Sequence, residues 1–293
     1  TNCVPGLENG SAQVVTVDGT AVGATTNYTY LWHTGSGLGS PIATETTPLL
    51  DQLQGSATSV YTILVTDITT GCQETEEFLI DDAKVLPIVN LGATDNSICN
   101  PALTVPANSV QFNGIVTATP TTGAVGDYTY VFGGGMGAGV QSSATDNTYE
   151  QLEGGATAYT VIATRTSTGC ASALTSIQVL NNQNIPDLVL GATSSTNCVA
   201  GKEDGTAFVN TVDGAAASAT GFTYAWTSTA FTITSNATND DITLTQVQGG
   251  ASFDYEVEVT NHSNGCVNTS SINVGDAKVL PIVNLGATDN SIC

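Results

Sequence analysis

The chain contains one eighteen-residue sequence twice, DAKVLPIVNLGATDNSIC, at residues 82–99 and again at residues 276–293. A single enzyme domain has no reason to carry its own middle as its C-terminal segment. Identity over this length, at a spacing far above that of a supersecondary unit, indicates tandem repetition of whole domains.

A shorter period lies inside the longer one, because three sequence landmarks recur three times in the same order. We predict a type-one repeat without its first strand (1–84), a type-two repeat (85–184), a type-one repeat (185–278), and the first strand of a following type-two repeat (279–293). The landmarks are an aromatic strand motif (27–32, 127–132, 221–226), a Gln-Leu/Val-x-Gly motif (52–57, 151–156, 246–251) and a Gly-Cys pair (71–72, 169–170, 265–266).

Each repeat has the pattern of an all-β domain of immunoglobulin size. Short segments alternate apolar and polar residues with period two, and Asp-Gly turns follow two of them. About seven such strands in a repeat of this length fit an immunoglobulin-like β-sandwich. The predicted strands include 11–17, 28–32, 61–66, 74–80, 159–164, 206–212 and 255–260.

The stretch between repeats is too apolar for a flexible linker, as in Val85–Ala93. We interpret it as the last strand of one repeat passing into the first strand of the next. Pro87, Pro186 and Pro281 then lie at edge or boundary positions, where a missing N–H is tolerated. Such junctions predict an extended, stiff rod of tandem sandwiches.

The seven cysteines alternate between long and short spacings, with one pair in each repeat. Because no CxxC pair occurs, the pattern favours disulfides over a metal site. We predict one bond within each repeat, which are Cys3–Cys72, Cys99–Cys170 and Cys198–Cys266. A bond between neighbouring repeats, such as Cys72–Cys99, is the alternative. Either pattern implies an oxidising location, so the chain is predicted to be secreted, extracellular and displayed on a cell surface.

Cys293 is left unpaired in this stretch of sequence. It has the same phase as Cys99, so its partner is expected beyond the end of the sequence. The chain is therefore interpreted as a window on a longer protein, with a free reactive thiol as the alternative.

The charge balance excludes several classes of partner. Four Lys and Arg residues stand against 26 Asp and Glu, which gives a formal net charge of -22. A nucleic-acid surface needs clustered basic side chains, and so does docking on anionic lipid. No apolar run reaches the length of a membrane span. The partners expected are neighbouring repeats of the same chain, with an external surface or a glycan contacted through other regions.

No arrangement of residues predicts catalysis, so the chain is not expected to be an enzyme or to need a cofactor. The two histidines, His33 and His262, do not stand at equivalent positions of their repeats. The Gly-rich stretch 133–139 has no Lys for a phosphate site. Carboxylates crowd the junctions, and calcium binding there is a hypothesis, because Ca²⁺ takes several oxygen ligands. The calcium candidates are Asp81, Asp82, Asp95, Asp276 and Asp289.

The aromatic motif places one large ring at the same position of each repeat, Trp32, Phe132 and Trp226, which we predict to be core residues. The order Cys3, Asn9–Ala12, Tyr28–Trp32 and Tyr61–Cys72 resembles the SprB-type repeats of Bacteroidota cell-surface adhesins, and residues 198–266 repeat it. The middle repeat differs, since Phe132 replaces Trp. The resemblance implies a very large secreted protein displayed as cell-surface filaments in attachment and gliding motility.

We therefore expect a non-catalytic repeat segment of a long extracellular surface filament that serves adhesion and gliding motility. Three alternatives remain open: an array of glycan-binding modules, an accessory region of a secreted hydrolase, and a pilus subunit. In the last case, residues 279–293 would complete the first repeat of the next subunit by strand complementation.

Overall fold

The computed structural model describes residues 1–22, 27–42, 46–107, 109–228 and 241–287. Over this part the chain consists of strands and turns, with two short 3-10 helices and no α-helix, as the all-β prediction requires. It divides into two compact units, each described by itself. One unit comprises Thr1–Ala93, Val116–Glu150 and Thr157–Gln178, and the other comprises Thr94–Ile115, Gln151–Ala156 and Val179–Cys293.

The first repeat has a four-stranded sheet of order β5-β4-β7-β8, a two-stranded sheet β1-β6 and a hairpin β2-β3. The hairpin turns at Asp18 and Gly19, which both have positive φ (50° and 72°), as a tight two-residue turn of this hand requires. The strands are β1 (Gly10–Gln13), β2 (Thr16–Val17), β3 (Thr20–Ala21), β4 (Tyr28–Thr34), β5 (Ser40–Pro41), β6 (Leu49–Leu53), β7 (Val60–Asp67) and β8 (Gln73–Leu79).

The second repeat has two three-stranded sheets, β12-β10-β9 and β11-β13-β14. The central pair β11 and β13 is antiparallel and runs in register from Tyr128 opposite Arg165 to Gly134 opposite Tyr159. The elements are β9 (Val89–Thr94), η1 (Pro101–Leu103), β10 (Gly114–Pro120), η2 (Val125–Asp127), β11 (Tyr128–Gly134), β12 (Thr148–Leu152), β13 (Tyr159–Arg165) and β14 (Thr175–Ile177).

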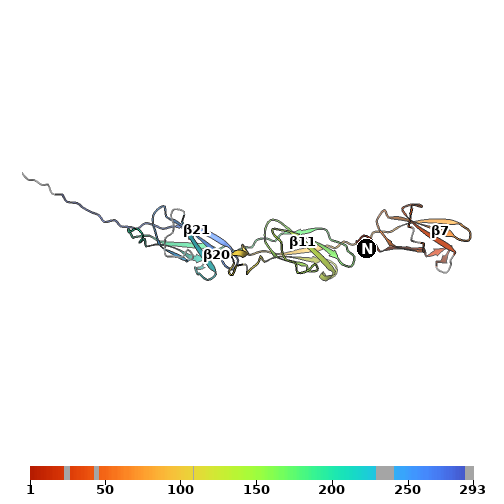
Figure 1. The fold of residues 1–293 in the computed structure, drawn as a ribbon, viewed down its shortest axis with the longest axis horizontal. Coiled ribbons are helices and arrows are strands. Elements are labelled where there is room, and N and C mark those ends of the chain that lie inside the picture. Colours follow the sequence, from red (N-terminus) through yellow and green to blue (C-terminus); the bar gives the residue numbers. More distant parts are fainter. Residues whose placement is uncertain (23–26, 43–45, 108, 229–240, 288–293) are drawn as a thin grey trace, which may run out of the picture. The chain divides into compact units, whose positions relative to one another are not determined.

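The third repeat places β15 beside β16, with β17 and β19 also paired to β16, and its other sheet has the order β18-β20-β21. Asp213 and Gly214 repeat the positive-φ turn of the first repeat. Figure 1 labels β7, β11, β20 and β21 in the sheets of the three repeats. The strands are β15 (Leu188–Thr193), β16 (Gly205–Val212), β17 (Ala215–Ala216), β18 (Phe222–Thr227), β19 (Thr243–Val247), β20 (Asp254–Asn261) and β21 (Val267–Asn273).

A separate apolar core belongs to each repeat and is built from the inward residues of its two main sheets. Trp32 and Trp226 are each 1% exposed, and each indole N–H donates to a backbone carbonyl fifteen residues later, that of Thr47 or Asp241. Phe132 is half-buried and stacks on Tyr149, with ring centroids 5.3 Å apart. The recurrent ring position therefore lies inside the sandwich in the first and third repeats.

The junction between the first two repeats differs from the continuous strand expected over Val85–Ala93. β8 ends at Leu79 and β9 begins only at Val89, so an irregular segment separates them. Pro87 and Pro186 each lie two residues before a strand, at β9 and β15, which fits their expected boundary role. Residues 279–287 form no strand, and Asp289 and Cys293 lie outside the described residues, so the strand expected at 279–293 stays a prediction.

Candidate functional site: the joints between repeats

The disulfides do not follow the predicted pattern. Cys3 bonds to Cys170 and Cys99 bonds to Cys266, each with Cα atoms 4.8 Å apart and 167 residues apart in sequence. The pairings Cys3–Cys72, Cys99–Cys170 and Cys198–Cys266 are therefore wrong, and so is the alternative Cys72–Cys99. Cys72 and Cys198, both predicted to be bonded, are free and exposed.

The third repeat shows why a bond within one repeat cannot form. Its first cysteine, Cys198, follows Ser195, which bridges to Asp276 just beyond the end of β21. Its second cysteine, Cys266, lies just before the start of β21. The seven residues of β21 span about 23 Å at ~3.3 Å per residue, whereas a disulfide needs Cα atoms within about 7 Å. The two cysteines of one repeat lie at opposite ends of its last strand.

The observed bonds follow one rule, in which the first cysteine of a repeat bonds to the second cysteine of the next repeat. We call this contact a joint. In both joints the backbone N–H of the first cysteine donates to the residue two positions before its partner, Cys3 to Thr168 O and Cys99 to Asn264 O, both at 2.8 Å. Cys170 and Cys266 are buried in these joints.

A glycine beside the second cysteine lets the two repeats approach. Gly169 and Gly265 both have positive φ (65° and 63°), and a Cβ on either would collide with the preceding repeat, with the Val4 side chain and the Asn100 carbonyl respectively. Gly71, the equivalent glycine of the first repeat, has φ 72°, and a Cβ placed there would meet nothing within 4 Å. The preceding repeat therefore lies against the Gly-Cys motif of the second and third repeats, while nothing in the described part of the chain lies against the Gly-Cys motif of the first repeat.

This contrast gives a matched pair of substitutions. Gly71→Ala is expected to destabilise the first repeat by about 1–2 kcal/mol, because only the positive φ is strained. Gly265→Ala is expected to cost the same strain and, in addition, to leave a fraction of Cys99 and Cys266 unbonded, because the new Cβ meets the Asn100 carbonyl. Maleimide labelling of denatured, unreduced protein counts the extra thiols. Equal labelling of the two variants would contradict the steric role of the glycine.

The segment before each first cysteine is tied to its own repeat by a polar side chain. Asp204 accepts hydrogen bonds from the backbone N–H groups of Thr196 and Asn197 and from the hydroxyl groups of Ser195 and Thr196. These bonds, led by that of the Thr196 hydroxyl, hold the pKa of Asp204 well below its ordinary value. Asparagine stands at the equivalent positions, where Asn9 accepts from Asn2 N and Asn113 accepts from Ser97 N.

The lowered pKa predicts a pH dependence for the third repeat. A carboxylate with a depressed folded-state pKa adds stability above its unfolded value, near 3.8, and that stability is lost as the pH falls through the folded value. The wild-type protein should therefore have a higher melting temperature than Asp204→Asn at pH 7. This difference in melting temperature should decrease steadily below about pH 4. Circular dichroism melts of both proteins from pH 7 to pH 2 measure it. A difference in melting temperature that stays constant with pH would show that the charge of the Asp204 carboxylate does not stabilise the repeat.

The calcium candidates that lie in the described part of the chain do not form a common metal site. Asp82 and Asp276 each accept from the backbone N–H two residues later and pair with Lys84 or Lys278 at 3.5 Å. Asp95 accepts from Leu180 N. Asp81 lies beside Asp82, and Asp289 is outside the described part. Within that part, no group of three or more His, Cys, Asp or Glu side chains could hold a metal ion.

The two histidines serve local structure. His33 is 6% exposed, with Nδ1 3.0 Å from Gly39 O. His262 Nε2 lies 2.6 Å from the Thr223 hydroxyl oxygen at the edge of the third repeat. They belong to different repeats and have no contact in common among these hydrogen bonds. Among the described residues, no helix is long and apolar enough to cross a membrane.

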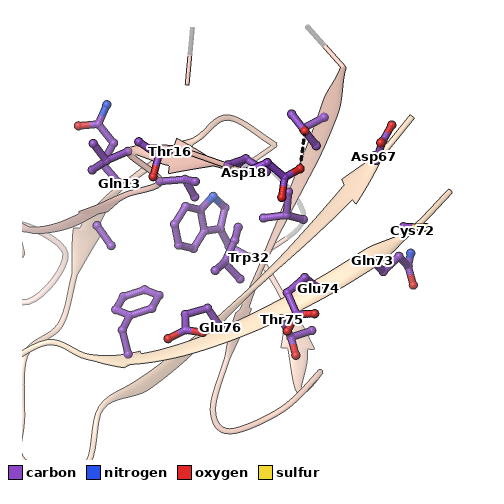
Figure 2. Close-up of a pocket in the computed structure, with 18 residues that line it drawn as sticks. Gln13, Thr16, Asp18, Trp32, Asp67, Cys72, Gln73, Glu74, Thr75 and Glu76 are labelled. Atoms are coloured by element: carbon purple, nitrogen blue, oxygen red, sulfur yellow. Dashed lines mark hydrogen bonds between the residues drawn. The ribbon is translucent and has the colours of Figure 1, made fainter. Parts of the chain in front are cut away.

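A groove of about 680 Å³ opens along the first repeat. One side is the segment 12–18, which includes the end of β1 and all of β2, and the other is β8 with the preceding Cys72, while Trp32 lies between them (Figure 2). Asp18 on its rim accepts a hydrogen bond from the Tyr28 hydroxyl at 3.0 Å, which raises the pKa of Tyr28. In the third repeat, β15 lies at this place, paired with β16 and in contact with β21.

The groove and the joint glycines were not among the sequence predictions. A usable signal was present, because 1–84 was expected to lack a first strand and the Gly-Cys pair was a recurrent landmark. Neither pattern shows which repeats meet, since the Gly-Cys pair recurs in every repeat and the missing strand concerns residues 1–84 alone.

No protein-family model matches the chain, and no curated protein matches it. Among solved structures, it is similar to three N-terminal domains of the bacteriophage RB49 Highly Immunogenic Outer Capsid protein (Hoc), with 14% identity and a TM-score of 0.31 over 93% of this chain and 96% of that one. It is also similar to domains 4-9 of surface layer protein SbsC, with 12% identity and a TM-score of 0.21 over 91% of this chain and 42% of that one.

Proposed function

We propose that the chain is a non-catalytic repeat segment of a long extracellular surface filament that serves adhesion and gliding motility. The observation that carries the proposal is the pair of joints, because each ties consecutive repeats covalently rather than stabilising one repeat alone. Bonds of this kind persist in oxidising surroundings, which supports a secreted or cell-surface location.

The two disulfides overlap in sequence, which suits a chain under mechanical tension. Cys99, the start of the second loop, lies inside the loop closed by Cys3 and Cys170. The shortest covalent path from Cys3 to Cys266 therefore crosses both bonds and only the 71 residues from Cys99 to Cys170. Tension along the filament is carried by this short path even if every sheet opens.

The surface chemistry also supports a structural role. The formal net charge of -22 disfavours self-association along the sides of a filament. The aromatic side chains with most stacking area, Trp32 and Trp226, are inside their cores and not displayed for a sugar. Hydrogen bonds within the repeat explain a lowered carboxylate pKa at Glu77. Its carboxylate accepts from the Ser36 hydroxyl and the Gly37 N–H, and both bonds lower the pKa.

Immunogold electron microscopy of native cells tests the location and the filament. Antibodies raised against the 293-residue chain should label long filaments projecting from the cell surface. Label inside cells, or only on compact secreted particles, would overturn the proposal.

Adhesion and gliding require a second measurement. Monovalent antibody fragments against the chain should reduce attachment to glass and the speed of surface movement at least severalfold, while fragments of an unrelated antibody should not. Unchanged attachment and movement at saturating fragment would remove the adhesive role and leave a structural one.

A further inference from the structure

The chain carries the two halves of a joint at different places, and neither half is used. Cys198 is a first cysteine like Cys3 and Cys99, and it is exposed and free. Cys72 is a second cysteine like Cys170 and Cys266, and it too is exposed and free, beside the open Gly71. We propose that a second copy of this chain completes the joint, with Cys198 of one copy bonded to Cys72 of the next.

The two existing joints serve as templates for this contact. In each, the N–H of the first cysteine donates to the residue two before its partner, which in the new joint is Thr70. In each, the residue after the first cysteine lies against the joint glycine, as Val4 lies against Gly169. Val199 follows Cys198, is 57% exposed, and would lie against Gly71.

The groove of the first repeat shows that this repeat also accepts a strand. Val14, Val17 and Val65 are only half-buried there. Their equivalents in the third repeat, where β15 covers them, are Val209, Val212 and Val259, with exposures of 2%, 4% and 0%. The same core positions therefore remain partly open in the first repeat, where no described strand takes the place that β15 has beside β16.

The segment 279–287 of the second copy matches this groove. Its sequence repeats residues 85–93, in which Val89 is buried in a core and Leu91 packs against it. The equivalent residues Val283 and Leu285 are 72% and 93% exposed. The segment carries no charge, so it meets no repulsion from the acidic rim formed by Asp18, Asp67, Glu74 and Glu76.

The pairing of β15 with β16 gives the register. Leu188 lies opposite Val212 and Leu190 opposite Val209. By position in the repeat, Val283 then lies opposite Val17 and Leu285 opposite Val14. Asn284 points away from the core, as the exposed Asn90 does in β9.

The bond forms by oxidation of two thiols, and the oxidant is a small disulfide such as oxidised glutathione. One cysteine thiolate attacks the small disulfide and releases one reduced thiol. The thiolate of the other cysteine then attacks the mixed disulfide and releases the second. Two protons and two electrons leave the protein, and one oxidised glutathione becomes two reduced ones.

Cross-linking of the purified chain tests the joint. All proteins carry Cys293→Ala, so that this thiol takes no part, and are incubated with oxidised glutathione. Non-reducing gels should show a ladder with steps of the 29.7 kDa chain, and mass spectrometry should identify a Cys72–Cys198 peptide. Cys72→Ser and Cys198→Ser should each abolish the ladder, while a mixture of the two should give dimers and nothing larger. A ladder that survives either variant, or a Cys72–Cys198 bond confined to single chains, would overturn the proposal.

Docking of the strand has its own matched variants. Val283→Asp and Leu285→Asp place a charge at the two core-facing positions and should slow ladder formation at least tenfold. Asn284→Asp adds the same charge at the outward position and should leave the rate within twofold of the parent. All three positions are exposed in the single chain, so its fold is preserved. Equal rates for the three variants would show that the strand does not enter the groove.

This inference rests on the proposed function, because consecutive repeats of a filament are tied by joints of this kind. The two proposals can fail separately, since the ladder uses purified chain and the filament is sought on native cells.

Discussion

Pulling the oxidised chain between Cys3 and Cys266 is expected to extend it to only about 250 Å, because 71 residues at ~3.5 Å each form the taut path. After reduction, all 263 residues between these positions should extend, to about 920 Å. Single-molecule force spectroscopy measures both lengths. The expected difference is nearly fourfold and comes from the overlap of the two loops.

Cysteine variants divide this effect into its parts. Cys170→Ala leaves one bond and a path of 96 residues from Cys3 to Cys99, or about 340 Å, and Cys99→Ala leaves an equal path through the other loop. Cys72→Ala is the matched control and should change nothing, because this thiol is free. A longer extension in Cys72→Ala would show that bonds form within repeats, contrary to the structure.

The core of the third repeat should be the most sensitive to truncation at Trp226. This side chain is 1% exposed, packs inside the cluster that joins the two sheets, and donates to Asp241 O at 2.9 Å. Trp226→Ala should destabilise the repeat by about 3–5 kcal/mol, since it removes packing and leaves a cavity. For a domain of this size, the transition of the third repeat should fall by more than about 12 °C. Calorimetry of the oxidised chain measures it.

The same variant contains its own internal control. Trp32 is the other tryptophan and belongs to the first repeat, so its fluorescence follows that repeat alone once Trp226 is gone. The fluorescence transition should keep its wild-type temperature in Trp226→Ala. Trp226→Phe, which keeps a ring in the core, should lose less than half as much stability. Equal losses in the alanine and phenylalanine variants would argue against a cavity as the cause.

Much of the strand pattern was predictable because it depends on neighbouring residues. Alternation over 61–66 and 255–260 predicted β7 and β20, and the Asp-Gly pairs predicted the turns at Asp18 and Asp213. Side-chain period and turn chemistry are local properties, and a tandem repeat displays them several times. The recurrent tryptophan position likewise predicted a core residue, which Trp32 and Trp226 are.

The site was less predictable, because spacing cannot tell one copy of a motif from the next. The cysteine pattern was compatible with bonds inside repeats, but β21 keeps Cys198 and Cys266 a strand length apart. Acidic residues near the first junction are close in sequence, yet Asp82 accepts from the N–H of Lys84 and Asp95 from the N–H of Leu180, 85 residues away.

The repeat, the all-β class, the turns and the burial of Trp32 and Trp226 follow from the amino-acid sequence, because each depends on residues within one strand or one turn. The choice of cysteine partners depends on the tertiary structure. A disulfide depends on where the ends of whole sandwiches come together, and identical motifs in successive repeats leave that choice to the packing. The first cysteine of each repeat is held at one end and the second at the other, so the partner has to come from the neighbouring repeat.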